Sequence, residues 1–285
     1  MITLKNGNSV LKVNELGAEM KSFTVNGTEY LWVGDDEHWG FSAPHVFPIT
    51  GRFENDKYNL NGKEYTLLRH GFARFLEYKV ESLTESSAVF LVTANEETKE
   101  QWPYDFEFRV CYEVSDGKVS VTYKVTNTDD KTMYFSVGSH DGYATPEGVA
   151  EYDILFYKQL TLDHSDVEDG VITGKKVNII KDSDILRLEN KYFEVDALVF
   201  CDVDFDSCKL VNRKTGRGIK LEFPGAPVVL VWSKPDYPFT CIEPWFGEPG
   251  HANSNNNIAE KENIQSIEPN ETFSCVRVIT ALEGK

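Results

Sequence analysis

The chain has 285 residues and a marked excess of acidic side chains, with 46 Asp and Glu against 29 Lys and Arg and a formal net charge of −17 at pH 7. Such a chain repels phosphate backbones and anionic membrane surfaces, which argues against a nucleic-acid-binding or membrane-binding protein. Apolar residues make up 41% of the sequence and aromatic residues 13%, which is enough for a large core and unlike a disordered chain.

Secretion and membrane insertion leave marks that this sequence lacks. The first residues, MITLKNGNSVLKV, contain no basic run followed by a long apolar stretch. No later run approaches the roughly 18 apolar residues that a transmembrane helix needs. The cysteines are odd in number and form no CxxC pair, which favours reduced thiols over disulfides or a zinc site. We therefore expect a cytoplasmic protein.

Two tight hairpins are predicted in the first quarter of the chain. In EMKSFTVNGTEYLWV (19–33) the pair Asn26-Gly27 joins two short runs of apolar and β-branched residues, and KYNLNGKEYTLL (57–68) repeats the arrangement at Asn61-Gly62. Asn-Gly adopts the positive φ angles of a two-residue turn at little cost. Both segments therefore predict antiparallel hairpins.

Short segments with alternating apolar and polar residues follow. Those in the first half are EYKVESLTE (77–85), SAVFLVTAN (87–95), FEFRVCYEVS (106–115) and KVSVTYKVTN (118–127). Turn residues interrupt them, as at Asp116-Gly117, and this spacing is typical of an antiparallel sandwich or barrel. The stretch NEETKEQWPYDF (95–106) favours one short helical turn before Pro103.

The second half of the chain has the same texture. Its predicted strand segments are FEVDALVFCDV (193–203), SCKLVNRKTGRGIKLEF (207–223), PVVLVWSKP (227–235) and ETFSCVRVITAL (271–282). No segment keeps a helical period over three turns, and no linker or low-complexity tract divides the chain. We therefore expect an all-β fold in which residues 1–285 form a single domain, with the Asn-rich stretch 251–263 as a long surface loop.

Two of the six histidines lie in unusual surroundings. His70 lies in LLRHGFARF between Arg69 and a Gly-Phe pair, with Arg74 four residues later. His140 lies in FSVGSHDGYATPEG, where an apolar run breaks into small residues that let a ligand approach the backbone. These contexts favour a functional role for both over the ordinary hydrogen-bonded histidine, which we expect at the remaining positions, His38, His45, His164 and His251.

One carboxylate stands among apolar residues. Glu243 lies in CIEPWFGEP, between Cys241-Ile242 and Pro244-Trp245-Phe246. A carboxylate held against aromatic surface is costly to ionise unless a partner pairs with it, and its pKa rises. Glu243 is therefore a candidate acid or base, and a structural ion pair is the alternative.

Other polar motifs indicate no chemistry. Asp202, Asp204 and Asp206 resemble the start of a calcium loop, but the glycine and the closing glutamate of such a loop are missing, so we expect a solvated turn. RKTGRG (213–218) lacks the strand-loop-helix context of a phosphate loop. No GxSxG motif is present, which disfavours a serine hydrolase of that type.

Five motifs together resemble the aldose 1-epimerase, or galactose mutarotase-like, family. They are FPITGRF with Arg52, RHGFAR with His70 and Arg74, SVGSHDGY with His140, EVDALVF with Asp196 and CIEPWFG with Glu243. They follow the order of that family, span nearly the whole chain, and are most similar to its shorter bacterial branch, often encoded beside lactose or galactose genes. The resemblance implies a β-supersandwich of large antiparallel sheets with a sugar cleft across one concave face.

The resemblance also implies an activity, the interconversion of the α and β anomers of a free aldohexose such as galactose or glucose, with no metal and no organic cofactor. In that pattern Glu243 is the base that takes the anomeric hydroxyl proton, and His140 is the acid that protonates the ring oxygen. The implied substrate-binding residues are His70, Arg52, Asp196, Arg74 and Trp245. The partner is then a small carbohydrate, and the protein is a monomer or a homodimer.

Three questions stay open in the sequence. Many relatives follow the acid histidine with Pro or with an aromatic residue shortly after, whereas here Asp141 and Gly142 follow. A carboxylate at this place raises the pKa of His140 if the two side chains meet, or else reshapes the pocket. A hexose-6-phosphate mutarotase is the alternative enzyme, with Arg52, Arg69 and Arg74 as possible phosphate partners. A carbohydrate-binding or regulatory protein without turnover is the alternative outside catalysis.

Overall fold

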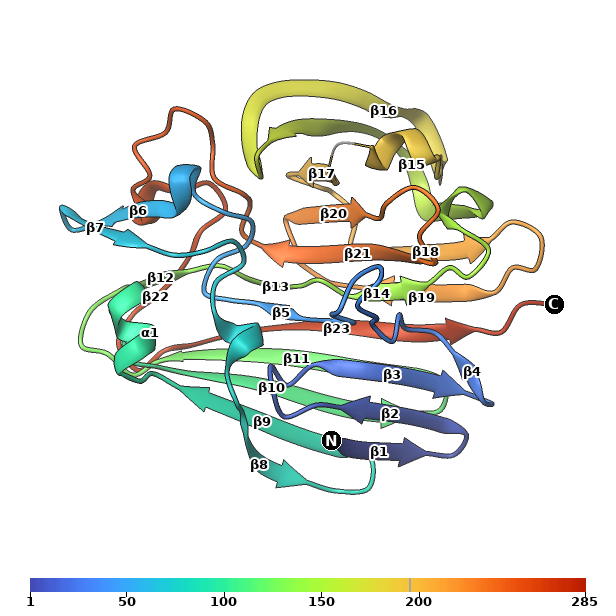
Figure 1. Ribbon diagram of the computed structural model, residues 1–285, viewed down its shortest axis with the longest axis horizontal. Helices are drawn as coiled ribbons and strands as arrows, with labels where there is room; N and C mark the ends of the chain where they lie inside the picture. The colour runs from blue at the N-terminus through green and yellow to red at the C-terminus, as the bar shows by residue number, and fades with distance from the viewer. Residues whose placement is uncertain (195) are drawn as a thin grey trace.

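Strands dominate the computed structural model of the protein, which describes residues 1–194 and 196–285 (Figure 1). The largest sheet has nine strands in the order β16-β15-β18-β19-β23-β11-β10-β9-β8. Its strands are β8 (Lys79–Leu83), β9 (Ser87–Thr93), β10 (Phe106–Ser115), β11 (Lys118–Asn127), β15 (Tyr152–Glu168), β16 (Val171–Arg187), β18 (Ser207–Asn212), β19 (Gly218–Glu222) and β23 (Thr272–Leu282). The all-β prediction is confirmed.

A second sheet of six strands carries part of the candidate site described below. Its order is β17-β20-β21-β13-β5, with β14 pairing against β21 beyond β13. These strands are β5 (His45–Val46), β13 (Val137–Ser139), β14 (Gly142–Ala144), β17 (Leu198–Cys201), β20 (Val228–Trp232) and β21 (Phe239–Phe246). In Figure 1 this sheet lies between the arch of β15 and β16 and the strands β23 and β11.

The remaining elements are short. A four-stranded N-terminal sheet and two two-stranded sheets consist of β1 (Ile2–Asn6), β2 (Ser9–Val13), β3 (Met20–Val25), β4 (Thr28–Glu29), β6 (Lys57–Leu60), β7 (Lys63–Thr66), β12 (Met133–Phe135) and β22 (Gln265–Ile267). The helical segments are α1 (Glu96–Gln101) and the 3₁₀ turns η1 (Glu54–Asp56), η2 (Ala73–Phe75), η3 (Val149–Glu151), η4 (Asn190–Phe193) and η5 (Ile258–Glu260). The predicted helical turn before Pro103 is confirmed as α1, which Asn95 caps by accepting from the Thr98 N–H.

Local sequence accounts for the hairpins. Asn26 and Gly27 have φ angles of 50° and 78°, and Asn61 and Gly62 have 52° and 79°, as two-residue turns require. The first pair joins β3 to β4 and the second joins β6 to β7, so both predicted hairpins are confirmed. In β10 and β11 every second side chain is buried, which matches their alternating sequence.

Aromatic rings fill the core between the sheets. Phe47 is fully buried, stacks on Phe108 at 4.6 Å between ring centroids, and meets Trp102 and Phe106 edge to face, at 5.3 Å in both cases. Offset and edge-to-face contacts of this kind stabilise a core beyond the area that they bury. The main core cluster extends from Leu4 to Ile279. That residues 1–285 form a single domain nevertheless remains a prediction.

The sequence did not predict the longest hairpin. Strands β15 and β16 have 17 residues each, and their register shifts at several points. Charged residues interrupt the apolar alternation along both strands, because much of the hairpin is exposed. In Figure 1 the hairpin arches above β17 and β20. Its turn, Asp169-Gly170, has positive φ angles at both residues and brings Gly170 to the candidate site.

The remaining expectations concern the loop 251–263, the strand segment 193–203 and membrane-spanning helices. The stretch 251–263 contains no strand, as predicted, but it is anchored by the buried residues Ile258 and Lys261. Within the predicted segment 193–203, Val195 lies outside the described residues. Among the residues that the structure describes, no helix is long and apolar enough to cross a membrane.

Candidate active site

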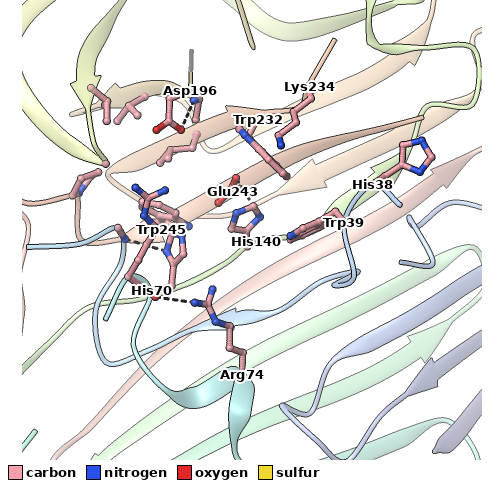
Figure 2. A pocket seen from close by; sticks show the side chains of 18 residues that line it. His38, Trp39, His70, Arg74, His140, Asp196, Trp232, Lys234, Glu243 and Trp245 are labelled. Atoms are coloured by element: carbon pink, nitrogen blue, oxygen red, sulfur yellow. Dashed lines mark hydrogen bonds and ion pairs between the residues drawn. The ribbon is translucent and has the colours of Figure 1, made fainter. Parts of the chain in front are cut away.

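A cavity of about 310 Å³ opens above β21 and collects side chains from distant parts of the chain (Figure 2). Glu243 and Trp245 come from β21, and Trp232 comes from β20. Loops supply the rest of the polar lining, which comprises His38, Arg69, His70, His140, Asp196 and Lys234, with Arg74 from η2. Side chains of six separate segments thus converge on one concave site, the usual form of a small-molecule site.

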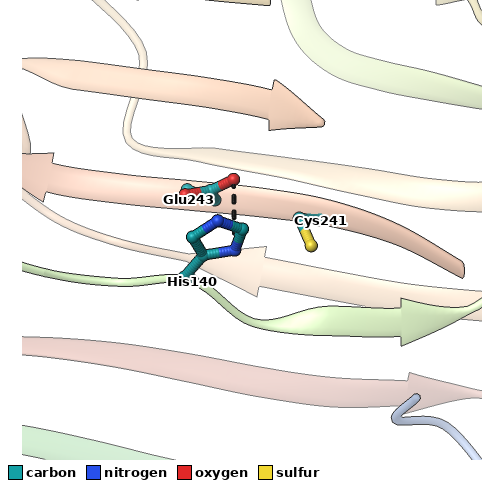
Figure 3. A group of neighbouring side chains, drawn as sticks. All are labelled: His140, Cys241 and Glu243. Atoms are coloured by element: carbon teal, nitrogen blue, oxygen red, sulfur yellow. Dashed lines mark ion pairs between the residues drawn. The ribbon is translucent and has the colours of Figure 1, made fainter. Parts of the chain in front are cut away.

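The register of the second sheet places Glu243 and His140 face to face. Residues 138 and 142 of β13 and β14 pair with residues 245 and 241 of β21, so His140 lies opposite Glu243. Directly opposite residues of antiparallel strands project from the same face. His140 Nδ1 lies 3.4 Å from Glu243 Oε1, as the dashed line in Figure 3 shows. Glu243 and His140 are the base and the acid that the family resemblance implies, and we call them the catalytic pair from here on as a name for that prediction.

The catalytic pair is removed from water. The Glu243 side chain is 1% exposed and the His140 side chain 13% exposed. Neither His140 Nδ1 nor Glu243 Oε2 has a hydrogen-bond partner among the described residues. A buried polar atom without a partner is costly in an inert protein and common where a ligand or a proton supplies the missing bond.

Burial shifts the two pKa values in opposite directions. Desolvation, together with the charges of Asp141 and Asp196, raises the pKa of Glu243 well above its ordinary value. Desolvation, with the cations Arg74 and Arg69 nearby, lowers the pKa of His140 to about 3. Burial disfavours the charged form of each group. Because the pKa of Glu243 is raised and that of His140 is lowered, a proton shared by the pair rests on Glu243 rather than on His140.

The backbone around His70 sets the tautomer of its imidazole. The backbone of His70 has a φ of 65°, which is rare for a residue with a side chain. The backbone N–H of His70 donates to the Gly51 carbonyl at 2.7 Å. The Gly51 N–H lies 3.2 Å from His70 Nδ1, which fixes that nitrogen as an acceptor. Burial and the nearby cations lower the pKa of His70 well below its ordinary value. The neutral ring then carries its proton on Nε2.

The glycine after His70 has a packing reason. A Cβ at Gly71 would lie 2.3 Å from the Phe47 carbonyl oxygen, and Gly71 has a φ of 66°. The Gly71 position bridges to Phe47, and the N–H groups of Phe72 and Ala73 both donate to the Phe47 carbonyl. The HGF sequence thus fixes the backbone that carries His70 against the core.

Aromatic rings flank the catalytic pair. The His140 ring contacts both Trp39 and Trp232, with ring centroids 4.9 and 5.5 Å away, and the two indoles lie 5.5 Å from each other. Both indoles are half-buried, unlike Trp245, which is 1% exposed and donates from its indole nitrogen to the Ser139 carbonyl at 2.8 Å. Half-buried indoles in a polar cavity can pack against the apolar face of a sugar ring.

The donor set at the catalytic pair suits proton transfer better than a metal ion. The Cys241 sulfur lies on the same face of β21, and its Sγ lies within 4.8 Å of ligand atoms of Glu243 and His140 (Figure 3). Burial and the neighbouring carboxylates raise the pKa of Cys241 well above its usual range, so it stays a thiol. A second cluster, Glu248 with His251 and Glu262, lies beside the buried ammonium of Lys261, which opposes a cation there.

Two comparisons with known proteins cover almost the whole chain. A family model described as aldose 1-epimerase matches residues 1–279. The plasmid-encoded protein LacX of Lactococcus lactis subsp. lactis is 30% identical over 296 aligned residues, which cover 99% of each chain. The chain belongs to the aldose 1-epimerase family.

Solved structures of aldose 1-epimerase relatives share the fold. A galactose mutarotase related enzyme from Lactobacillus acidophilus superposes with a TM-score of 0.94 at 30% identity, covering 100% of this chain and 98% of its own. A galactose mutarotase-like protein from Lactobacillus casei gives a TM-score of 0.94 at 25% identity, covering 99% and 100%. The expected galactose mutarotase-like architecture of antiparallel sheets is therefore confirmed.

The substrate-binding residues that the family resemblance implied separate into two groups. His70, Asp196, Arg74 and Trp245 all line the cavity. Arg52 lies outside the lining, because its guanidinium binds Asp56 at 2.6 and 2.9 Å and Asp169 at 2.8 Å. Through Asp169 it holds the turn of the β15–β16 hairpin beside the cavity.

The aspartate that follows His140 does not meet its imidazole. Asp141 is fully buried and faces Arg277 of β23, which donates to both carboxylate oxygens at 2.6 and 3.0 Å. Tyr143 also donates to Asp141, at 3.3 Å, and the Arg277 guanidinium lies over the Tyr123 ring. The condition for a raised His140 pKa, that the two side chains meet, is therefore not fulfilled, and Asp141 ties the turn between β13 and β14 to the large sheet.

The sequence analysis did not single out several residues that line the cavity. Trp39, Trp232 and Lys234 were not singled out, and His38 was taken as an ordinary histidine, yet all four line the cavity. No local pattern marks Trp39 or Lys234, because both lie in loops. None of the calcium-like aspartates lines the cavity, and Asp204 pairs with Lys158 at 2.8 Å on the surface.

Proposed function

We propose that the protein is an aldose 1-epimerase that interconverts the α and β anomers of an aldohexose by acid/base ring opening. The observation that carries this proposal is the catalytic pair, a carboxyl with an unpartnered Oε2 that faces an imidazole in a cavity with aromatic walls. Mutarotation needs one group that accepts a proton and one that donates a proton, both near neutral pH. Titratable groups whose surroundings push their pKa values apart are typical of such chemistry.

The proposed reaction assigns one residue to each proton transfer. Glu243 takes the proton of the anomeric hydroxyl while His140 gives a proton to the ring oxygen, so the bond from C1 to the ring oxygen breaks and C1 becomes an aldehyde carbon. After rotation about the C1–C2 bond, the two transfers reverse on the other face. The N–H of neutral His70 donates to the ring oxygen, and Asp196 accepts hydrogen bonds from ring hydroxyls.

The reactive form of the pair needs the shared proton on His140. Glu243 is then ionised and His140 is protonated. The Glu243 Oε1 and the His140 Nδ1 lie 3.4 Å apart. An ion pair at this distance offsets part of the desolvation that disfavours each charge alone. Closure of the cavity by a sugar removes the remaining water, which strengthens this attraction.

Polarimetry on freshly dissolved α-glucose and α-galactose tests the proposal. The expected result is an exchange rate that rises in proportion to protein concentration above the spontaneous rate. A His140→Gln variant should lose most of that increment, because the amide cannot give a proton to the ring oxygen. If calorimetry detects sugar binding while the exchange rate stays at the spontaneous value for common aldoses and their 6-phosphates, the protein is a carbohydrate-binding module and the proposal is wrong.

A further inference from the structure

The Asn-rich loop 251–263 borders a second cavity, of about 250 Å³, and none of the described residues lines both this cavity and the candidate active site. In Figure 1 the loop, drawn in orange-red after β21, lies beside β6. The Asn59 amide of β6 donates to the Asn255 carbonyl at 2.8 Å, and the Asn256 amide donates to the Glu54 carbonyl at 3.2 Å. The wall of the cavity is therefore fixed by hydrogen bonds. Its size suits a ligand smaller than the drug-sized molecules that fill roughly 300–1,000 Å³.

A buried lysine without a carboxylate partner lines the second cavity. Among the described residues, the buried lysine and arginine side chains are Lys261 and Arg277, which are 8% and 3% exposed. Arg277 pairs with Asp141 at 2.6 Å, whereas Lys261 makes no ion pair with any described residue. The Lys261 ammonium donates to the Glu248 backbone carbonyl, and it lies 5.9 Å from the centre of the Phe53 ring. An ammonium has three donors, so a charge that is costly to bury keeps two donors without a partner in the described chain.

The surroundings of Lys261 favour a nucleophilic amine. Desolvation lowers the pKa of Lys261 to about 8, although the carboxylates of Glu248 and Glu262 act in the opposite direction. Roughly a tenth of these side chains are thus neutral amines at pH 7, and the neutral amine is the nucleophile. His251 lines the same cavity, and its Nε2 lies 3.1 Å from Glu248 Oε1, a contact that raises the pKa of His251. A nucleophile and a proton donor therefore face one cavity.

The charges and amides of the lining select the class of ligand. Lys261 opposes a cation, while Glu260 and Glu262 oppose an anion. The three asparagine amides of residues 255–257 each donate one N–H to another described residue and keep a second. Amides beside carboxylates can donate to hydroxyl groups and accept from them, and an amine reacts with a carbonyl carbon. A neutral ligand with several hydroxyls and an aldehyde meets all of these conditions.

We propose that the second cavity binds the open-chain form of a reducing sugar, whose aldehyde condenses with Lys261 to a reversible imine. The lone pair of Lys261 Nζ attacks the aldehyde carbon, and the carbonyl electrons move to the oxygen, which takes a proton released by the nitrogen. The hydroxyl then leaves as water with a proton from His251, while the nitrogen forms the C=N bond and returns its last proton to the imidazole. One amine and one aldehyde thus give one imine and one water, with no oxidant or reductant. This site does not depend on the proposed function.

Reductive trapping tests the site in the wild-type protein. The probe is ¹³C-labelled glucose with cyanoborohydride at pH 7, which reduces an imine to a stable secondary amine, and peptide mapping by mass spectrometry locates the label. Lys261 should be labelled roughly tenfold or more faster than Lys12, an exposed lysine of β2, because more of Lys261 is neutral. Sorbitol has the hydroxyls of open-chain glucose but no aldehyde, so it should slow labelling of Lys261 and leave that of Lys12 unchanged. Labelling of Lys261 that is no faster than that of Lys12, or that sorbitol does not slow, would overturn the proposal.

Two histidine variants test the proton donor. His251→Gln should slow labelling of Lys261 by roughly tenfold or more, because the amide cannot give a proton to the departing hydroxyl. His38→Gln is the matched control, since His38 and His251 are 27% and 31% exposed and lie 3.0 and 3.1 Å from a carboxylate three residues earlier. His38 lines the candidate active site instead, so His38→Gln should leave labelling of Lys261 unchanged. Equal losses in the two variants would contradict the role assigned to His251.

Discussion

Replacing Glu243 by Gln should slow the reaction and stabilise the fold. The amide keeps the shape of the side chain but accepts no proton, so the exchange rate should fall about 10²- to 10⁴-fold, the usual contribution of a positioned base. Gln also never ionises, whereas burial makes ionisation of Glu243 costly in the folded protein. Catalytic loss combined with gained stability separates an active-site carboxyl from a structural one.

The gain in stability follows from the sign of the pKa shift. Above the ordinary carboxyl value of 4.5 the unfolded chain releases the Glu243 proton, while the folded protein keeps it because its pKa is raised. The free energy of unfolding therefore falls by about 1.4 kcal/mol for each pH unit between those two pKa values. From pH 5 to pH 7 the wild type should thus lose up to about 3 kcal/mol relative to Glu243→Gln.

Urea unfolding of both proteins at pH 5, 6 and 7 measures this difference. The gap between Glu243→Gln and the wild type should widen as the pH rises. Glu64→Gln, on the exposed strand β7, is the control and should show no widening gap, because its carboxyl is 57% exposed. A gap for Glu243→Gln that is independent of pH would mean that the buried carboxyl ionises as easily in the folded protein as in the unfolded chain, and would refute the reasoning.

Three further outcomes are expected. The pH profile of kcat/KM should stay flat through pH 6.5, since the pKa of the pair's imidazole is lowered to about 3, and should fall only on the alkaline side, where the pair loses its one proton. Gly71→Ala should lower activity and the melting temperature more than Gly62→Ala, which has a similar φ but no atom within 4 Å of an added Cβ. In urea titration, Asp141→Ala should lower the free energy of unfolding by about 3–5 kcal/mol, because Arg277 loses its buried counter-charge, whereas Asp204→Ala on the surface should cost less than about 1 kcal/mol.

Local patterns predicted most of the fold because the hairpins and β8 to β11 are determined by neighbouring residues. Asn26-Gly27 determines its turn through its own backbone angles, and the alternation in β10 and β11 follows from one face being buried. The β15–β16 hairpin escaped prediction because its exposure removes that alternation. Its place over the second sheet depends on contacts with β17 and β18, far along the chain.

In the candidate site, too, local features could be predicted from the sequence and contacts between distant residues could not. Glu243 was marked by its apolar neighbours, and the register of β21 against β13 and β14 brings it to His140. Contacts between residues far apart in the sequence could not be predicted, since nothing near Asp141 in the sequence indicates Arg277. Arg52 is the reverse case: its motif was recognised, but its guanidinium is bound by two aspartates rather than free in the cavity.

The most direct measurement is a crystal structure of the Glu243→Gln variant with a bound aldose. The account predicts the amide of residue 243 at hydrogen-bond distance, about 2.6–3.2 Å, from the anomeric oxygen, with a nitrogen of His140 at the same distance from the ring oxygen. A sugar bound with its anomeric carbon away from both residues would contradict the assignment of Glu243 and His140 as the catalytic pair.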